Sequence, residues 1–61
     1  MTIHVIRLYS KSLGTLQLAD TAYRTRYGAE AELRKSGYAD RGQGRWESPK
    51  MLAAITELRL L

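Results

Sequence analysis

The sequence predicts one small α+β domain spanning residues 1–61, and three observations lead to this prediction. Two segments, 2–9 and 15–19, show the alternation and residue types of strands. A central segment ends in residues that terminate helices, and a glycine-rich turn follows it. With 61 residues and no cysteine, the chain has room for a single core and no disulfide to stabilise it.

β-branched and aromatic residues dominate the N-terminal segment. Residues 2–9 have the sequence Thr-Ile-His-Val-Ile-Arg-Leu-Tyr, which is typical of a strand. A polar loop from Ser10 to Gly14 separates it from the second alternating segment at 15–19. We therefore expect an N-terminal β-hairpin.

A helix is expected to end at Ser36. Gly37 is suited to the left-handed conformation that follows many helices, and Tyr38 would then contact Leu33, as in a Schellman motif. The basic residues Arg34 and Lys35 match the negative end of the helix dipole.

The start of this central helix has two interpretations. Asp20 or Thr21 could cap a long helix that passes through Gly28 at a cost of about 1 kcal/mol. Residues 21–27 also alternate as a strand does. We favour the long helix, because the two possible caps and Ala22 support it.

A second hairpin is expected around Gly42–Gly44, since this glycine-rich turn joins two short segments, 38–41 and 45–48. Trp46 would be its core residue. The two arginines that flank the turn, Arg41 and Arg45, would form an exposed basic tip.

The C-terminal segment fits both a helix and a strand. Ser48-Pro49 has the pattern of an N-cap followed by proline at the first helical position, and apolar residues recur at helical spacing after it. Residues 52–60 alternate as well, so a strand is the alternative. We favour a C-terminal helix over 49–60.

The net charge is +4, and seven of the ten basic residues lie between positions 24 and 50. Tyrosines and Trp46 are interleaved with them, a combination that nucleic-acid-binding proteins use for phosphate contact and base stacking. The rings serve equally well as core, since the chain has no phenylalanine. The candidate partner-binding residues are Arg24, Arg26, Arg34, Lys35, Arg41 and Arg45.

The sequence predicts no catalytic, cofactor or metal site. His4 is the only histidine and there is no cysteine, so neither a nucleophile–base pair nor a zinc site can be assembled from these residues. Glu30 and Glu32 are two residues apart on a helix and point in different directions, so they are assigned to the helix dipole. Tight-turn geometry explains Gly42 and Gly44 without a phosphate loop.

The stretch from Leu33 to Tyr38, followed by Arg41–Gly44 and Trp46–Pro49, resembles the helix–hairpin part of small HicA-type toxins. Those toxins have a double-stranded-RNA-binding-like fold and are ribonucleases with a histidine in the hairpin, where this chain has Arg45 or Trp46. The resemblance implies affinity for nucleic acid without the nuclease activity. In size and lack of cysteine the chain is also similar to small proteins of phages and mobile elements, including anti-CRISPR inhibitors, which implies stoichiometric inhibition.

We therefore expect a non-enzymatic binding protein, a phage-type inhibitor that docks through a basic surface on a protein complex that handles nucleic acid. The alternatives are weakly specific DNA or RNA binding and a homodimer sealed by Leu58, Leu60 and Leu61. No segment has the pattern of a signal peptide or membrane span, so we expect a cytoplasmic protein without membrane contact.

Overall fold

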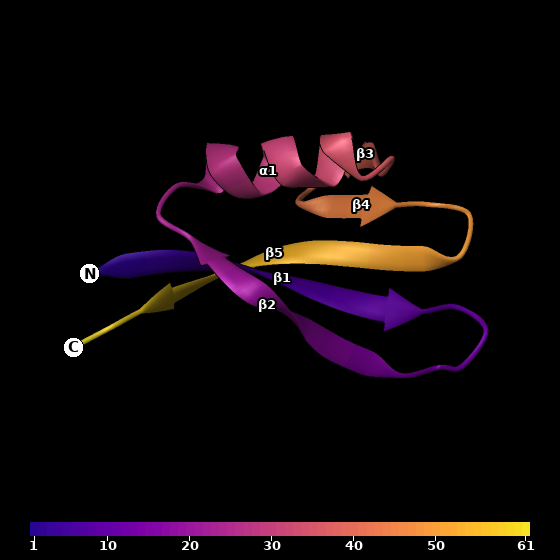
Figure 1. Ribbon diagram of the computed structural model, residues 1–61, viewed down its shortest axis with the longest axis horizontal. Helices are drawn as coiled ribbons and strands as arrows, with labels where there is room; N and C mark the ends of the chain where they lie inside the picture. The colour runs from indigo at the N-terminus through magenta and orange to yellow at the C-terminus, as the bar shows by residue number, and fades with distance from the viewer.

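The structure, a computed structural model that describes all residues from Met1 to Leu61, is an antiparallel five-stranded sheet with a helix on one face (Figure 1). The strand order is β2-β1-β5-β4-β3, so the first and last strands of the chain pair at the centre of the sheet. The α+β prediction is confirmed, with one helix in place of the expected two. In chain order the elements are β1 (Thr2–Ser10), β2 (Leu16–Tyr23), α1 (Arg26–Lys35), β3 (Ala39–Gly42), β4 (Arg45–Glu47) and β5 (Met51–Arg59).

The predicted C-terminal helix is wrong, because residues 51–59 form the central strand β5. This strand pairs with β1 in continuous register from Thr2↔Arg59 to Ser10↔Met51. A helix there would leave one edge of β1 unpaired and would forgo this ladder. Ser48-Pro49 starts a tight turn instead of a helix: the Ser48 N–H donates to the Met51 carbonyl at 2.9 Å, and the Met51 N–H donates to Ser48 Oγ at 3.1 Å.

The N-terminal hairpin is confirmed and is longer than expected, since β2 continues to Tyr23. The long helix starting at Asp20 or Thr21 is therefore wrong. Thr25 is the N-cap of α1, and its Oγ1 accepts a hydrogen bond from the Gly28 N–H at 3.1 Å. Gly28 thus lies in the first turn, where a glycine is less costly than in the middle of a helix.

The later start also changes the role of the helix carboxylates. No acidic residue lies in the first turn of α1. Glu30 instead forms an ion pair with Arg26, one turn earlier, at 3.3 Å. The prediction that Glu30 and Glu32 stabilise the start of the helix through its dipole is therefore wrong, because the helix begins after the Thr25 cap and both residues lie beyond its first turn.

The predicted end of the helix is confirmed. Ser36 is the C-cap and Gly37 has a φ of 90°, a left-handed conformation that glycine adopts without strain. The Gly37 N–H donates to the Arg34 carbonyl at 3.1 Å and the Tyr38 N–H to the Leu33 carbonyl at 2.9 Å. These two hydrogen bonds are those of a Schellman motif.

The second hairpin is also confirmed, with β3 and β4 joined at Gln43 and Gly44. Both turn residues have positive φ, 55° and 76°, as a type I′ turn requires. The hairpin places Trp46 in the core, where the side chain is almost fully buried.

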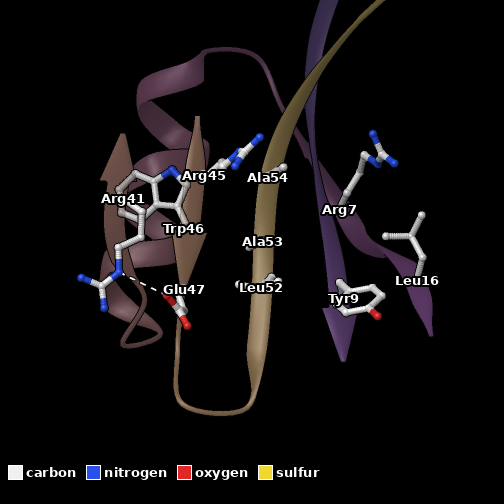
Figure 2. A pocket seen from close by; sticks show the side chains of 10 residues that line it. All are labelled: Arg7, Tyr9, Leu16, Arg41, Arg45, Trp46, Glu47, Leu52, Ala53 and Ala54. Carbon is white, nitrogen blue, oxygen red and sulfur yellow. Dashed lines mark hydrogen bonds and ion pairs between the residues drawn. The ribbon is translucent and has the colours of Figure 1, made fainter. Parts of the chain in front are cut away.

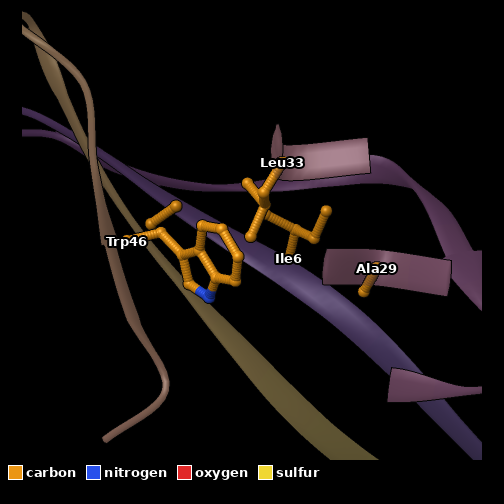
Figure 3. Packing of buried hydrophobic residues seen from close by; sticks show 5 residues of the cluster. Ile6, Ala29, Leu33 and Trp46 are labelled. Atoms are coloured by element: carbon orange, nitrogen blue, oxygen red, sulfur yellow. The ribbon is translucent and has the colours of Figure 1, made fainter. Parts of the chain in front are cut away.

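The core is a single small layer between α1 and one face of the sheet (Figure 3). Tyr23 and Tyr38 pack around it and are half-buried, which confirms that part of the aromatic set is structural. The opposite face of the sheet has no helix or loop over it (Figure 1). The structure contains no helix with the length and hydropathy that a membrane crossing requires. The fully buried residues are Ile6, Ala29, Leu33, Trp46 and Ala53.

Candidate functional site

The uncovered side of the sheet, which we call the open face, is a continuous surface with no helix or loop packed on it (Figure 1). Side chains alternate along a strand, so the neighbours of buried Ile6 and Ala53 point to this side. Most of these residues are aliphatic, and cross-strand pairing places them in rows. The open face consists of Ile3, Val5, Arg7, Tyr9, Leu16, Leu18, Arg41, Arg45, Glu47, Leu52, Ala54, Thr56 and Leu58.

A groove of about 470 Å³ lies on the half of the open face formed by the end of β1 and the start of β5 (Figure 2). Strand β5 forms its floor with Leu52 and the small residues Ala53 and Ala54. The small side chain of Ala54 creates the hollow, because larger side chains rise on both sides. One wall comes from β1 and β2 with Arg7, Tyr9 and Leu16, and the other from β3 and β4 with Arg41, Arg45 and Glu47.

Two cross-strand rows define the chemistry of the groove. In the first row, Ala54 pairs with Arg7 on one side and with Arg45 on the other. Antiparallel pairs alternate between Cα separations of about 5.5 and 4.5 Å, so the two arginine Cα atoms are about 10 Å apart. In the second row, Leu52 lies between Tyr9 and Glu47. The groove therefore has a cationic row beside a largely apolar one.

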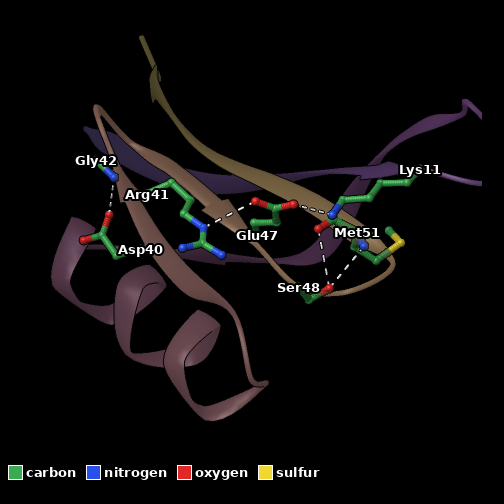
Figure 4. A network of polar contacts seen from close by, with 7 residues as sticks. All are labelled: Lys11, Asp40, Arg41, Gly42, Glu47, Ser48 and Met51. Carbon is green, nitrogen blue, oxygen red and sulfur yellow. Dashed lines mark hydrogen bonds and ion pairs between the residues drawn. The ribbon is translucent and has the colours of Figure 1, made fainter.

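Glu47 is the only carboxylate of the groove, and two cations neutralise it (Figure 4). Lys11 forms an ion pair with it, and Arg41 Nε donates to Glu47 Oε1 at 3.3 Å. The hydrogen bond and charge of Lys11, followed by the charge of Arg41, hold the pKa of Glu47 below its ordinary value. Arg7 and Arg45 form no ion pair and are exposed, so the groove retains unneutralised positive charge.

The structure brings together only two of the six residues predicted to bind a partner. Arg41 and Arg45 line the groove, as expected for the tip of the second hairpin. On the helix side, Arg34 lies over the Trp46 ring, with its guanidinium carbon 5.2 Å from the ring centroid. Such a position is a cation–π contact that stabilises the core tryptophan.

The remaining candidates are distributed around α1. Arg26 is paired with Glu30. Arg24 lies in the connection from β2 to α1, and Lys35 lies on the last turn; both are exposed. Sequence reasoning missed Arg7, although its position two residues after Val5 already placed it on the same side of the first strand.

The helix side carries a second hollow of about 370 Å³ with the opposite charge. Asp20 and Glu32 line it together with Tyr23 and apolar residues of β1 and α1. Burial, followed by the charges of Glu32 and Asp20, raises the pKa of Tyr23. This hollow is therefore acidic, unlike the groove of the open face. No three His, Asp or Glu side chains converge where they could hold a metal ion.

In comparisons with known proteins, the chain matches no protein family, no curated protein and no solved structure. Its function is therefore inferred from the chemistry of its own surface.

Proposed function

We propose that the chain is a non-enzymatic binding domain that docks through its open face on an acidic protein surface. The observation that carries this proposal is the apolar groove between Arg7 and Arg45, two exposed arginines without a counter-charge. Arg7 and Arg45 lie on the two strands that flank β5, and like charges so placed do not stabilise a small sheet. An acidic partner would neutralise these two arginines.

The side chains of the open face favour a protein partner over nucleic acid. Single strands are bound on aromatic platforms, and Tyr9 is the only aromatic residue here that is substantially exposed, at 38%. The rest of the apolar area is aliphatic, with Leu16 58% and Leu52 40% exposed. Arginine around an apolar centre is a combination enriched in protein–protein interfaces.

Charge also restricts where such a domain would dock on a complex that handles nucleic acid. The groove that holds nucleic acid in such a complex is itself basic, and it would repel Arg7 and Arg45. An acidic outer surface or a subunit interface of the complex is compatible with these residues. We therefore propose inhibition or regulation by occupying a protein surface, as a phage-type inhibitor would, and not by filling a nucleic-acid groove.

Direct, weakly specific binding of DNA or RNA is the second candidate function. The positive charge of Arg7 and Arg45 favours it, because phosphate neutralisation supplies most non-specific affinity. Gel shifts at low and moderate salt test this candidate. It requires binding that weakens steeply as salt is added, and a chain that binds neither single strands nor duplex at low salt excludes it.

A homodimer is the third possibility, since Leu58, Leu60 and Leu61 are all exposed. Packing two open faces together would bring the unpaired arginines of both copies into one interface, which is electrostatically unfavourable. Sedimentation over a dilution series tests it. A constant monomer mass removes the dimer, whereas a mass that doubles with concentration supports it.

The main proposal is tested by affinity capture with matched charge reversals. Tagged wild-type chain is used to capture proteins from a lysate of the source cells, in parallel with Arg7→Glu/Arg45→Glu and with the control Arg24→Glu/Lys35→Glu. The two variants change the net charge equally but on different surfaces. We expect a partner that the open-face variant loses and the control retains. A partner lost from the control instead would place the binding surface around α1.

A further inference from the structure

We infer that the groove recognises an extended acidic segment of its partner. One carboxylate of this segment would bind between Arg7 and Arg45, and the apolar side chain two positions along the segment would pack on Leu52. The inference rests on the proposed docking through the open face and specifies which feature of the partner the groove selects. Its two components are a carboxylate subsite in the cationic row and an apolar subsite in the row beside it.

The carboxylate subsite lies above Ala54. The methyl group of Ala54 leaves the space between the two arginines empty, so the groove is deep enough there for an incoming side chain (Figure 2). With Cα atoms about 10 Å apart, both arginine side chains can reach one group midway between them. A guanidinium donates two parallel hydrogen bonds to a carboxylate, and one carboxylate can neutralise both arginines in part.

The apolar subsite lies one row further along the strands. Tyr9, Leu16 and Leu52 are all exposed there and surround the same hollow. Rows on one face of a sheet are about 7 Å apart, because every second residue faces the same side. The side chains on one side of an extended partner segment recur at the same spacing. An acidic residue above Ala54 therefore places the residue two positions away above Leu52.

The same rows disfavour a nucleic-acid strand. Phosphates along a strand repeat at roughly the spacing of these rows, so a phosphate above Ala54 would bring the next one toward the second row. That row presents leucines and Glu47, whose carboxylate already engages Lys11 and Arg41, so a second phosphate would have to compete with Glu47 for these cations. An acidic segment of a protein needs only one anionic contact, and it fits both rows.

A defined peptide tests the inference. The probe is acetyl-Thr-Thr-Leu-Thr-Glu-Thr-Leu-Thr-Thr-amide, whose symmetry allows it to bind in either direction. One control peptide has glutamine in place of glutamate. A second has the same composition, with each leucine three residues from the glutamate instead of two. Binding to the ¹⁵N-labelled full chain is followed by amide chemical shifts, which report both the affinity and the position of the peptide.

We expect shifts at Arg7, Arg45, Leu52 and Ala54, and roughly five- to ten-fold weaker binding for each control peptide, since each loses one of the two contacts. Arg7→Gln and Arg45→Gln should each weaken the glutamate peptide by a similar factor. Lys35→Gln, on α1, should leave its affinity unchanged. A dispersed spectrum of each variant shows that the fold is retained.

Three results would overturn the inference: equal affinity for the glutamate and glutamine peptides, shifts confined to α1, or shifts at the open face with oligo-dT but with none of the peptides. If the glutamate peptide does not bind but affinity capture still depends on Arg7 and Arg45, the inference of an acidic segment is refuted and the proposed docking surface is retained. Failure of both experiments would refute the docking surface itself.

Discussion

The same chemical change, glycine to alanine, should have opposite effects at the two ends of α1. Gly37 has a φ of 90°, and a Cβ built there meets no atom within 4 Å. The cost of Gly37→Ala is therefore purely that of the left-handed backbone, about 1–2 kcal/mol. At Gly28 the backbone is helical, and the nearest atom to an added Cβ, Thr25 Oγ1, is 3.4 Å away. Gly28→Ala should therefore stabilise the chain by up to about 1 kcal/mol.

These changes are large for so small a domain, whose total free energy of unfolding is on the order of 3–9 kcal/mol. Thermal unfolding followed by circular dichroism should show a midpoint lowered by roughly 5–15 °C for Gly37→Ala and raised by up to about 8 °C for Gly28→Ala. Equal destabilisation by both substitutions would refute the reasoning, because it would mean that α1 does not begin at the Thr25 cap and end at Gly37.

Three further changes probe the rest of the structure. Trp46→Ala removes the largest buried side chain at a cost of about 3–5 kcal/mol, comparable to the whole stability, so the cooperative thermal transition should disappear; a variant that still melts near the wild-type temperature would contradict the core. Thr25→Ala removes the N-cap and should lower the free energy of unfolding by about 1 kcal/mol in urea titrations, where an unchanged midpoint would argue against the cap. The contribution of Glu47 to stability is complete above its ordinary pKa of 4.5 and is lost as the pH falls through its lower value in the folded chain, since the unfolded chain binds the proton first. Glu47→Gln should therefore make acid unfolding less steep, and identical acid profiles would show that Lys11 and Arg41 do not hold this carboxylate.

Local sequence signals predicted the parts of the fold that are decided locally. The helix end at Ser36 depends on Gly37 and Tyr38, and the second hairpin depends on the Gly42–Gly44 turn. Both are confirmed, because the residues that determine them are also the residues that adopt the structure. The first hairpin is similar, since its strands are joined by a short loop.

The errors arose where distant pairing decides between two patterns. Residues 51–59 have apolar residues at helical spacing and also alternate, and only the ladder with β1, at the other end of the chain, selects the strand. The start of α1 is a similar case, because pairing with β1 extends β2 to Tyr23 and delays the helix to Arg26. The residue pattern within either segment does not indicate this long-range pairing with β1.

In the candidate site, too, the residues placed by local sequence were predicted and those placed by distant strand pairing were not. Arg41 and Arg45 were predicted from their positions beside the turn, and the structure places both on the open face. Grouping all basic residues by sequence also included Arg34, which instead covers Trp46 on the helix side. Arg7 was missed because it joins Arg45 only through the register of two strand pairs with β5.

The central claim, that the open face is uncovered in the free chain and buried by a partner, is tested most directly by solvent paramagnetic relaxation of methyl groups. A soluble gadolinium chelate is added to methyl-labelled chain, alone and with the captured partner. We predict strong relaxation of Leu16, Leu18 and Leu52 in the free chain, loss of that relaxation in the complex, and protection of Leu33 throughout. Open-face methyls that stay equally exposed after the partner binds, while groups around α1 become protected, would contradict the account.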